Sequence, residues 1–256
     1  MIWEAIQYLS TRPKLPVAKE MDYLKESIAM VSRAKRCQAQ WGAHYQQCQQ
    51  AIINAFTPLK HKRTVIVIGA GTLNDVPLKP LSEAFEKVIL VDLVFLKSAY
   101  RMADKYANIE LVEHDVTESL NALKHGISNV EKPMRWLDDE RVDLVVSLNL
   151  VTQLPLIPVR WLMSRFDFTE TQVDRIGKQL ITEHLSYLSK FEARVCLIAD
   201  QEDVEFNQAG EVVDRFDPWW DVEPPTAEYF WEWQVVPLGE GRSGIYQQNR
   251  VGVCFL

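Results

Sequence analysis

Short runs of apolar, β-branched residues recur along the middle of the chain and predict buried strands. They occupy residues 64–68, 88–92, 109–112, 142–147 and 195–200. An unbroken apolar run of this length is typical of a strand covered on both faces in a parallel sheet. Stretches with helical spacing separate the runs, and Thr169 with Gln172 has the spacing of a capping box before a long helix. This alternation predicts an α/β sheet with right-handed crossovers and a ligand at the carboxyl ends of its strands.

The first quarter of the chain predicts helices rather than strands. Residues 1–20 contain Pro13 and Pro16 and indicate an irregular lead-in. From 21 to 56 there is no proline, and apolar residues recur at spacings of three and four. This pattern favours an amphipathic helix, or two helices broken near Gly42. We therefore expect a helical cover over residues 1–60 and a main domain over residues 61–256.

The last quarter has a different texture, because acidic and aromatic residues dominate from 201 to 226. Residues 230–236 and 249–255 predict two strands, and the glycine-containing loop between them favours an antiparallel pair. Two interpretations of the aromatic residues stay open: packing in the core or a lid, or a pocket for a planar or cationic small molecule. The aromatic residues in question are Trp219, Trp220, Tyr229, Phe230, Trp231 and Trp233. The apolar segment 154–163 is expected to form a second cover over the site.

Composition narrows the class of protein. With 256 residues, of which 47% are hydrophobic, the chain is long enough to bury one complete α/β core. The formal net charge of -7 argues against general attraction to nucleic acid or to an anionic membrane. We expect a cytoplasmic protein, because residues 1–4 lack a basic stretch followed by an apolar core, and no membrane segment, because no apolar run approaches the roughly 20 residues that span a bilayer.

The four cysteines are far apart in the sequence, and neither they nor the histidines show the spacing of a metal site. They are Cys37, Cys48, Cys196 and Cys254. We expect reduced, structural cysteines and no bound metal.

The strongest candidate for a binding site is the glycine turn that follows the first apolar run. Gly69 and Gly71 let the backbone approach a ligand closely, and Asp92 lies about 20 residues further on, at the end of the second run. Asp115 follows the third run, and Asn149 follows the fourth. Taken singly, an aspartate after a strand is more often a turn or helix-cap residue. Together, their order along one predicted sheet indicates a nucleotide-like ligand.

These motifs resemble those of class I S-adenosylmethionine-dependent methyltransferases. The resemblance rests on Val-Ile-Gly-Ala-Gly-Thr at 67–72, Val-Asp-Leu at 91–93, His-Asp-Val at 114–116 and Ser-Leu-Asn at 147–149, and it covers about residues 60–256. It implies an enzyme with a Rossmann-like fold: a mostly parallel sheet with a C-terminal antiparallel hairpin and helices on both faces. Segments 36–41 and 147–155 are similar to bacterial members whose acceptor is unknown to us.

The resemblance implies S-adenosylmethionine as the cofactor and gives each motif a role. Asp92 would accept hydrogen bonds from the ribose hydroxyls, Asp115 and the Val116 N–H would meet adenine, and Leu148 with Asn149 would lie beneath the sulfonium. The cofactor-binding residues that it implies are Gly69, Ala70, Gly71, Thr72, Asp75, Asp92, Leu93, Asp115, Val116, Leu148 and Asn149.

The chain departs from the family pattern at two places. The family usually has an acid where this chain has Val67, so Asp75 becomes the nearest carboxylate for the methionine amino group. The Asn/Asp-Pro-Pro-Tyr/Phe motif of enzymes that methylate DNA or glutamine amino groups is absent. This absence favours a small-molecule acceptor and makes nucleic acid an unexpected partner.

Other functions remain open at this stage. An NAD-dependent oxidoreductase also uses a glycine turn followed by an acid, although Asn74 stands where its third glycine belongs. Other nucleotide ligands are possible, including the donor of an aminopropyl group. A non-catalytic subunit that binds the cofactor or a protein partner is a further alternative, because function belongs to sites rather than to folds.

A catalytic base is needed only if the acceptor must lose a proton, since methyl transfer from a sulfonium depends mostly on positioning. The candidates for base or orienting residue are His44, Asn149, His184 and Asp200, with Gln153 as a second orienting residue. An ordinary packing or surface role is the alternative for each histidine.

Overall fold

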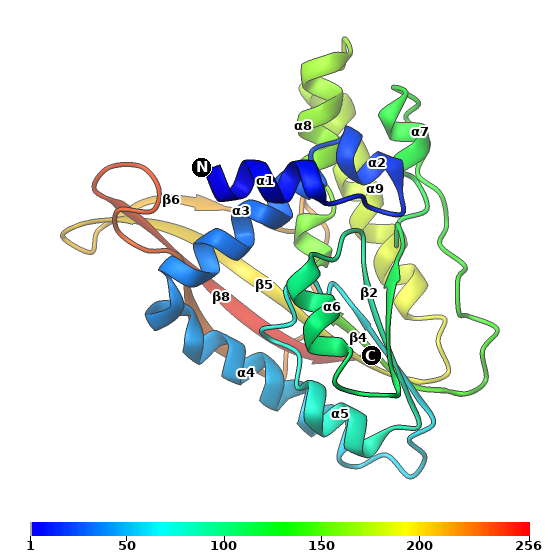
Figure 1. Ribbon diagram of the computed structural model, residues 1–256. Coiled ribbons are helices and arrows are strands. Elements are labelled where there is room, and N and C mark those ends of the chain that lie inside the picture. Colours follow the sequence, from blue (N-terminus) through cyan, green and yellow to red (C-terminus); the bar gives the residue numbers. More distant parts are fainter. Residues whose placement is uncertain (1) are drawn as a thin grey trace.

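The computed structural model describes residues 2–256 as one twisted sheet flanked by helices (Figure 1). The strand order is β3-β2-β1-β4-β5-β8-β7, and β6 pairs with β5 off this path. Strands β1 to β5 are parallel to one another, whereas β8 runs antiparallel to both β5 and β7. The strands are β1 (Thr64–Ile68), β2 (Lys87–Asp92), β3 (Ile109–Glu113), β4 (Val142–Leu148), β5 (Arg194–Asn207), β6 (Val212–Phe216), β7 (Tyr229–Val236) and β8 (Ile245–Phe255).

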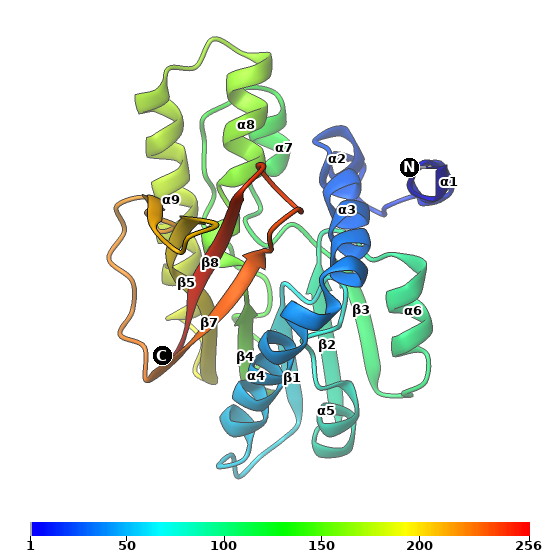
Figure 2. The ribbon, with the colours of Figure 1, turned by 90° about the vertical axis from the view of Figure 1, so that its left-hand side faces the viewer.

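Helices connect the parallel strands and precede the sheet (Figures 1 and 2). They are α1 (Ile2–Ser10), α2 (Pro16–Glu20), α3 (Tyr23–Arg36), α4 (Gln38–Phe56), α5 (Leu78–Ala84), α6 (Lys97–Ala103), α7 (Leu120–Lys124), the 3-10 turn η1 (Val151–Gln153), α8 (Leu156–Arg165) and α9 (Glu170–Leu188). Thr169 and Gln172 form the expected capping box at the start of α9.

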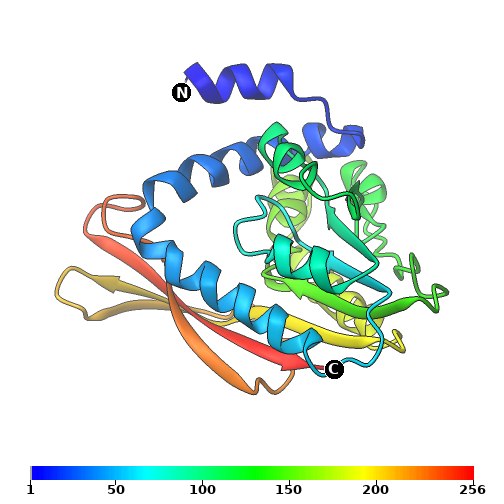
Figure 3. The same ribbon diagram turned by 60° about the horizontal axis from the view of Figure 1, so that its bottom comes forward.

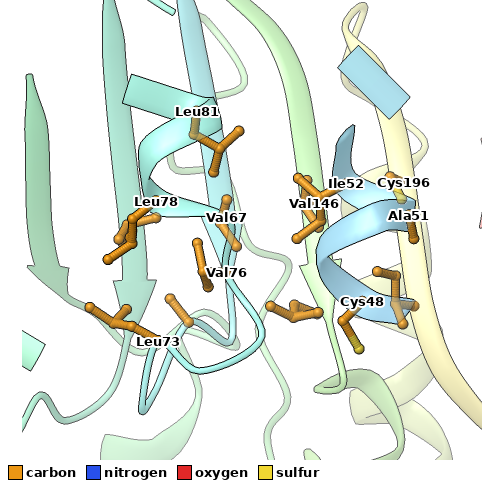
Figure 4. Close-up of a cluster of buried hydrophobic side chains, with 14 of the residues drawn as sticks. Cys48, Ala51, Ile52, Val67, Leu73, Val76, Leu78, Leu81, Val146 and Cys196 are labelled. Atoms are coloured by element: carbon orange, nitrogen blue, oxygen red, sulfur yellow. The ribbon is translucent and has the colours of Figure 1, made fainter. Parts of the chain in front are cut away.

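Both faces of the sheet are buried, because successive side chains of a strand point to opposite faces. On one face Val67 of β1 and Val146 of β4 belong to one cluster, in which Figure 4 shows Val67 near Leu81 of α5 and Val146 near Ile52 of α4. On the other face Ile66 belongs to a second cluster with Ile181 of α9. The mostly parallel sheet, the helices on both faces and the antiparallel C-terminal strands confirm the expected Rossmann-like fold.

Two expectations for the first 56 residues were wrong. The lead-in is helical, since Pro16 opens α2 at the first helical position, where proline costs no backbone hydrogen bond. The break between α3 and α4 lies at Cys37 and not at Gly42. Cys37 is buried in the main core, which fixes the turn there, whereas Gly42 lies inside α4 with open space around it. The domain boundary near residue 60 stays a prediction.

The stretch after 200 is more regular than its composition suggests. Strand β5 continues to Asn207, turns through Gly210 and pairs antiparallel with β6. All five residues of β6 are exposed, so no apolar alternation marks this strand in the sequence. Among the helices of residues 2–256, none has the length and apolar character that a transmembrane helix requires.

Candidate functional site

The glycine turn after β1 brings the ends of two strands into close contact. Gly69 has a φ of 86°, and its N–H donates to the carbonyl of Val91 over 2.9 Å. A Cβ on Gly69 would lie 2.5 Å from the carbonyl oxygen of Leu148 at the end of β4. Only glycine fits this backbone conformation and this close approach.

A cavity of about 260 Å³ opens at this edge of the sheet. Residues at the carboxyl ends of β1, β2 and β4 line it together with side chains of α3 and α4. Figure 3 shows the ribbons of these two helices running alongside the sheet. All of the cofactor-binding residues expected from the sequence line the cavity: Gly69, Ala70, Gly71, Thr72, Asp75, Asp92, Leu93, Asp115, Val116, Leu148 and Asn149. The structure therefore brings these residues to one place, while their individual roles stay predictions.

Asp92 is held firmly at the end of β2. Its Oδ2 accepts a hydrogen bond of 2.8 Å from the Gly71 N–H, and its Oδ1 accepts one of 2.8 Å from the Leu93 N–H. Burial raises the pKa of Asp92 to about 6. The carboxylate thus connects the glycine turn to β2, and it lines the cavity with fixed oxygen atoms.

Asp115 also lines the cavity, yet its carboxylate is largely occupied by its own turn. Oδ1 accepts hydrogen bonds from the Thr117 N–H and hydroxyl at 3.0 and 2.7 Å, and Oδ2 accepts one of 2.8 Å from the Leu120 N–H. The turn-residue role, which the sequence left open for such an aspartate, is therefore present. A contact with adenine would be additional to it.

A compact polar group connects β4, the glycine turn and α4. The Asn149 Nδ2 donates to the Asp75 Oδ2 over 3.1 Å, and it lies 3.5 Å from the Cys48 sulfur and 3.3 Å from the His44 Nε2. Burial raises the pKa of Asp75 to about 6 and lowers the pKa of His44 to about 3. His44 is therefore neutral at physiological pH.

We expected no cysteine and histidine to have the spacing of a metal site, and this group contradicts that expectation. The ligand atoms of His44, Cys48 and Asp75 lie within 4.8 Å of one another, and the i,i+4 spacing of the first two on α4 was the signal in the sequence. However, the Trp231 Nε1 donates to the His44 Nδ1 over 3.1 Å. A neutral imidazole that accepts at Nδ1 carries its proton on Nε2, where the Cys48 sulfur at 3.5 Å can accept it, so His44 has no ring nitrogen free to bind a cation.

The structure separates the four catalytic candidates into two pairs. His44 and Asn149 line the cavity, whereas His184 and Asp200 are buried away from its lining. The His184 Nε2 lies 2.9 Å from the Ser147 hydroxyl, and burial lowers its pKa to about 4. A catalytic role of His184 or Asp200 stays an untested prediction.

An aromatic wall lies at one end of the cavity. The sequence left a pocket role open for Trp233, but it did not identify Trp41 and Tyr45 as lining residues. Trp41 and Tyr45 of α4 line the cavity together with Trp233 of β7, whose ring stacks on His44 at a centroid distance of 3.8 Å and 9° between planes. Trp41 meets Trp233 edge-on at 5.4 Å. The C-terminal aromatic residues therefore have two different locations. Trp233 lines the cavity, whereas Trp219 is buried in the core cluster that includes residues of α9.

The cavity is rich in carboxyl groups. Four of its lining residues are acidic: Glu26, Asp75, Asp92 and Asp115. Over residues 2–256, no lysine or arginine belongs to the lining. Its second histidine, His114, has a pKa lowered mainly by burial and then by Arg135, so it adds no fixed positive charge at pH 7.

Comparison with known proteins adds structural neighbours. No protein-family model and no curated protein matches this chain. A 1,6-didemethyltoxoflavin N1-methyltransferase of Burkholderia thailandensis, solved with S-adenosylhomocysteine, is 14% identical over 94% of this chain and 93% of its own, with a TM-score of 0.42. An S-adenosylmethionine-dependent methyltransferase of Leishmania major is 10% identical over 98% of this chain and 89% of its own, with a TM-score of 0.41. The N-methyltransferase NodS of Bradyrhizobium japonicum, solved with S-adenosylhomocysteine, is 9% identical over 81% of this chain and 85% of its own, with a TM-score of 0.36. With likenesses this distant, function is argued from the site itself.

Proposed function

We propose that this protein is an S-adenosylmethionine-dependent methyltransferase that acts on a small-molecule acceptor. The observation that carries the proposal is the cavity at the carboxyl ends of β1, β2 and β4. There the glycine turn and a fixed Asp92 carboxylate face a space lined by acids, with no lysine or arginine in the described lining. Such a lining favours a ligand with a sulfonium and an ammonium group over one with phosphates.

The residues present fit this cofactor. Gly69, Gly71 and Asp92 line the same cavity, and the Asp92 oxygens, held by the Gly71 and Leu93 N–H groups, would accept hydrogen bonds from the two ribose hydroxyls. Asp75, whose Oδ2 accepts a hydrogen bond from Asn149, also lines the cavity and would pair with the methionine ammonium. When bound, S-adenosylmethionine supplies a methyl group on a good leaving group, so the chain mainly has to position the acceptor.

The polar group around Asn149 favours positioning over proton removal. His44 has a pKa of about 3, and its Nδ1 already accepts a hydrogen bond from Trp231. A base this weak contributes little to proton transfer at neutral pH. We infer that His44 orients its neighbours and that Asn149 contacts the acceptor.

The same cavity is poorly suited to NAD. In dinucleotide-binding proteins the pyrophosphate lies at the N-terminus of the helix that follows the glycine turn. Here α5 begins only at Leu78, after Pro77, and its first N–H donates to the Val76 carbonyl. The pyrophosphate would meet neither a helix end nor a cationic side chain of the described lining.

Calorimetric titration of the purified protein with S-adenosylmethionine, S-adenosylhomocysteine and NAD tests the proposal. We expect saturable binding of the two adenosyl ligands and none of NAD. NAD binding alone would support the oxidoreductase, and binding of no ligand would overturn the proposal in favour of an interaction subunit. A cytoplasmic location also stays a prediction.

A further inference from the structure

Asp75 is held differently from the other aspartates of the cavity. Main-chain N–H groups hold Asp92 and Asp115, whereas the Asp75 Oδ2 accepts its hydrogen bond of 3.1 Å from the side-chain Nδ2 of Asn149. Asp75 is half-buried and lines the cavity. Its orientation therefore depends on what holds the Asn149 amide.

The main chain of Asn149 is fixed at the end of β4. Its N–H donates to the carbonyl of Ile198 in β5 over 2.8 Å, and its φ of 48° lies in the left-handed region, which asparagine adopts more readily than most residues. The backbone thus fixes where the side chain begins, and the contacts of the amide decide how it is turned.

Two residues of α4 and one of β7 decide which atoms the amide contacts. The Asn149 Nδ2 lies 3.5 Å from the Cys48 sulfur and 3.3 Å from the His44 Nε2. The Trp231 Nε1 donates to the His44 Nδ1 over 3.1 Å, so the neutral ring carries its proton on Nε2. A protonated Nε2 cannot accept from the Asn149 Nδ2. The amide hydrogens are therefore left for the Cys48 sulfur and for Asp75.

The middle of this series of contacts is closed to water. His44 is 2% exposed and Cys48 is fully buried. The Trp233 ring stacks on the imidazole at 3.8 Å, and burial raises the pKa of Cys48, which keeps the thiol neutral. Hydrogen bonds in such surroundings meet little competition from solvent, so a change at one end is felt at the other.

We propose that Trp231, His44 and Asn149 are positioning residues for the cofactor, which together hold the Asp75 carboxylate in place for the ammonium group of S-adenosylmethionine. This inference rests on the proposed function, because Asp75 has this task only if the cofactor binds in the cavity. It extends the cofactor site from the glycine turn to β7 in the last part of the chain. A carboxylate fixed by such supporting residues does not have to be ordered when the ligand binds.

The experiment compares two ligands by calorimetric titration. S-Adenosylhomocysteine carries the ammonium group, whereas 5′-deoxy-5′-methylthioadenosine has the same adenosine and a thioether but no amino acid part. Asp75→Asn removes the negative charge, and we expect it to weaken binding of S-adenosylhomocysteine about tenfold while binding of methylthioadenosine changes less than about twofold.

Trp231→Phe removes the indole N–H and keeps an aromatic ring. We expect it to weaken binding of S-adenosylhomocysteine about threefold, with methylthioadenosine unaffected. Asn149→Gly removes the amide and suits the φ of 48°, and it should weaken binding of S-adenosylhomocysteine about fivefold. Trp3→Phe, at a tryptophan that is 63% exposed, is the control and should change neither affinity.

Two further readouts separate positioning from a merely structural role. If Trp231 acts through Asp75, Trp231→Phe should have no further effect on binding of S-adenosylhomocysteine in the Asp75→Asn protein. In NMR spectra, the side-chain nitrogens of His44 should show the proton on Nε2 in the wild type and partly on Nδ1 in Trp231→Phe.

The positioning role is overturned if Trp231→Phe weakens both ligands equally or neither, if its effect adds to that of Asp75→Asn, or if wild-type His44 carries its proton on Nδ1. It is also overturned if the wild type binds S-adenosylhomocysteine no more tightly than methylthioadenosine, because Asp75 then makes no ammonium contact. Failure of the wild type to bind either ligand is a separate result, which overturns the proposed function itself.

Discussion

The two ends of the cavity are built in different ways. The end expected to hold the cofactor consists of strand termini and turns within residues 69–149, connected by main-chain hydrogen bonds such as that from the Gly69 N–H to the Val91 carbonyl. The aromatic end joins α4 to β7, where His44 stacks on Trp233. Side-chain packing between distant segments forms this second end.

The difference indicates how each end tolerates change. Backbone geometry at the cofactor end admits few residue types, because a Cβ on Gly69 would meet the Leu148 carbonyl. The aromatic end has flat surfaces that keep their packing when one ring replaces another. We therefore expect the cofactor end to tolerate few substitutions. The aromatic end should tolerate exchange of one aromatic residue for another.

The largest effect is expected from Gly69→Ala. A Cβ there combines a φ of 86° with a distance of 2.5 Å to a main-chain oxygen, so the free energy of unfolding should fall by at least about 2 kcal/mol. Urea denaturation measures this change. Gly42→Ala is the matched control, because it lies inside α4 with open space around it and should raise stability by about 0.5–1 kcal/mol. Equal stability of the two variants would contradict a tightly constrained turn.

Asp92→Ala should follow. The variant loses the carboxylate that we propose as the ribose acceptor, and we expect the Kd for S-adenosylhomocysteine to rise at least tenfold, which is about 1.4 kcal/mol. Calorimetry measures the affinity, and Asp104→Ala, at an exposed aspartate after α6, provides the control. An unchanged affinity in a folded Asp92→Ala protein would exclude the ribose role.

The two ends should also differ in their response to pH. Burial raises the pKa of Asp92 to about 6, so the carboxylate that we propose as the ribose acceptor is lost by protonation as pH falls through 6. We expect the Kd for S-adenosylhomocysteine to rise about tenfold from pH 7.5 to pH 5. Asp92→Asn should flatten this profile.

At the aromatic end, burial lowers the pKa of His44 to about 3, so His44 stays neutral over the same range. Its ring resonances in NMR spectra should not move between pH 5 and pH 8. If His44 titrated near pH 6 while the affinity for S-adenosylhomocysteine stayed constant, the pH-sensitive group would lie at the aromatic end and not at the cofactor end.

The smallest effect is expected from the ion pair between Glu26 of α3 and Arg160 of α8, which are 2.8 Å apart beside the cavity. Both side chains are exposed, and such surface pairs contribute about 0–1 kcal/mol. Arg160→Gln should raise the dissociation rate of S-adenosylhomocysteine by up to about threefold at low salt, in stopped-flow measurements, with no change for the exposed Arg175→Gln. A difference that persists at 1 M salt would show that charge is not the cause.

Much of the fold followed from local patterns in the sequence. Residues 64–68 and 88–92 are short apolar runs typical of a strand buried on both faces, and the structure has β1 and β2 there. The capping box at Thr169 also fixed the start of α9 from adjacent residues alone. The five exposed residues of β6 carried no such pattern, because that strand is held by its pairing with β5.

The sequence by itself determined the glycine turn, the acids at the strand ends and their convergence at one edge, because parallel strands bring their carboxyl ends together. Only the tertiary structure decided which aromatic residues face the cavity and which, like Trp219, belong to the core. It also decided that His44 is neutral and hydrogen-bonded to Trp231. Burial and contact across nearly the whole chain cause both properties, and neither leaves a mark on neighbouring residues in the sequence.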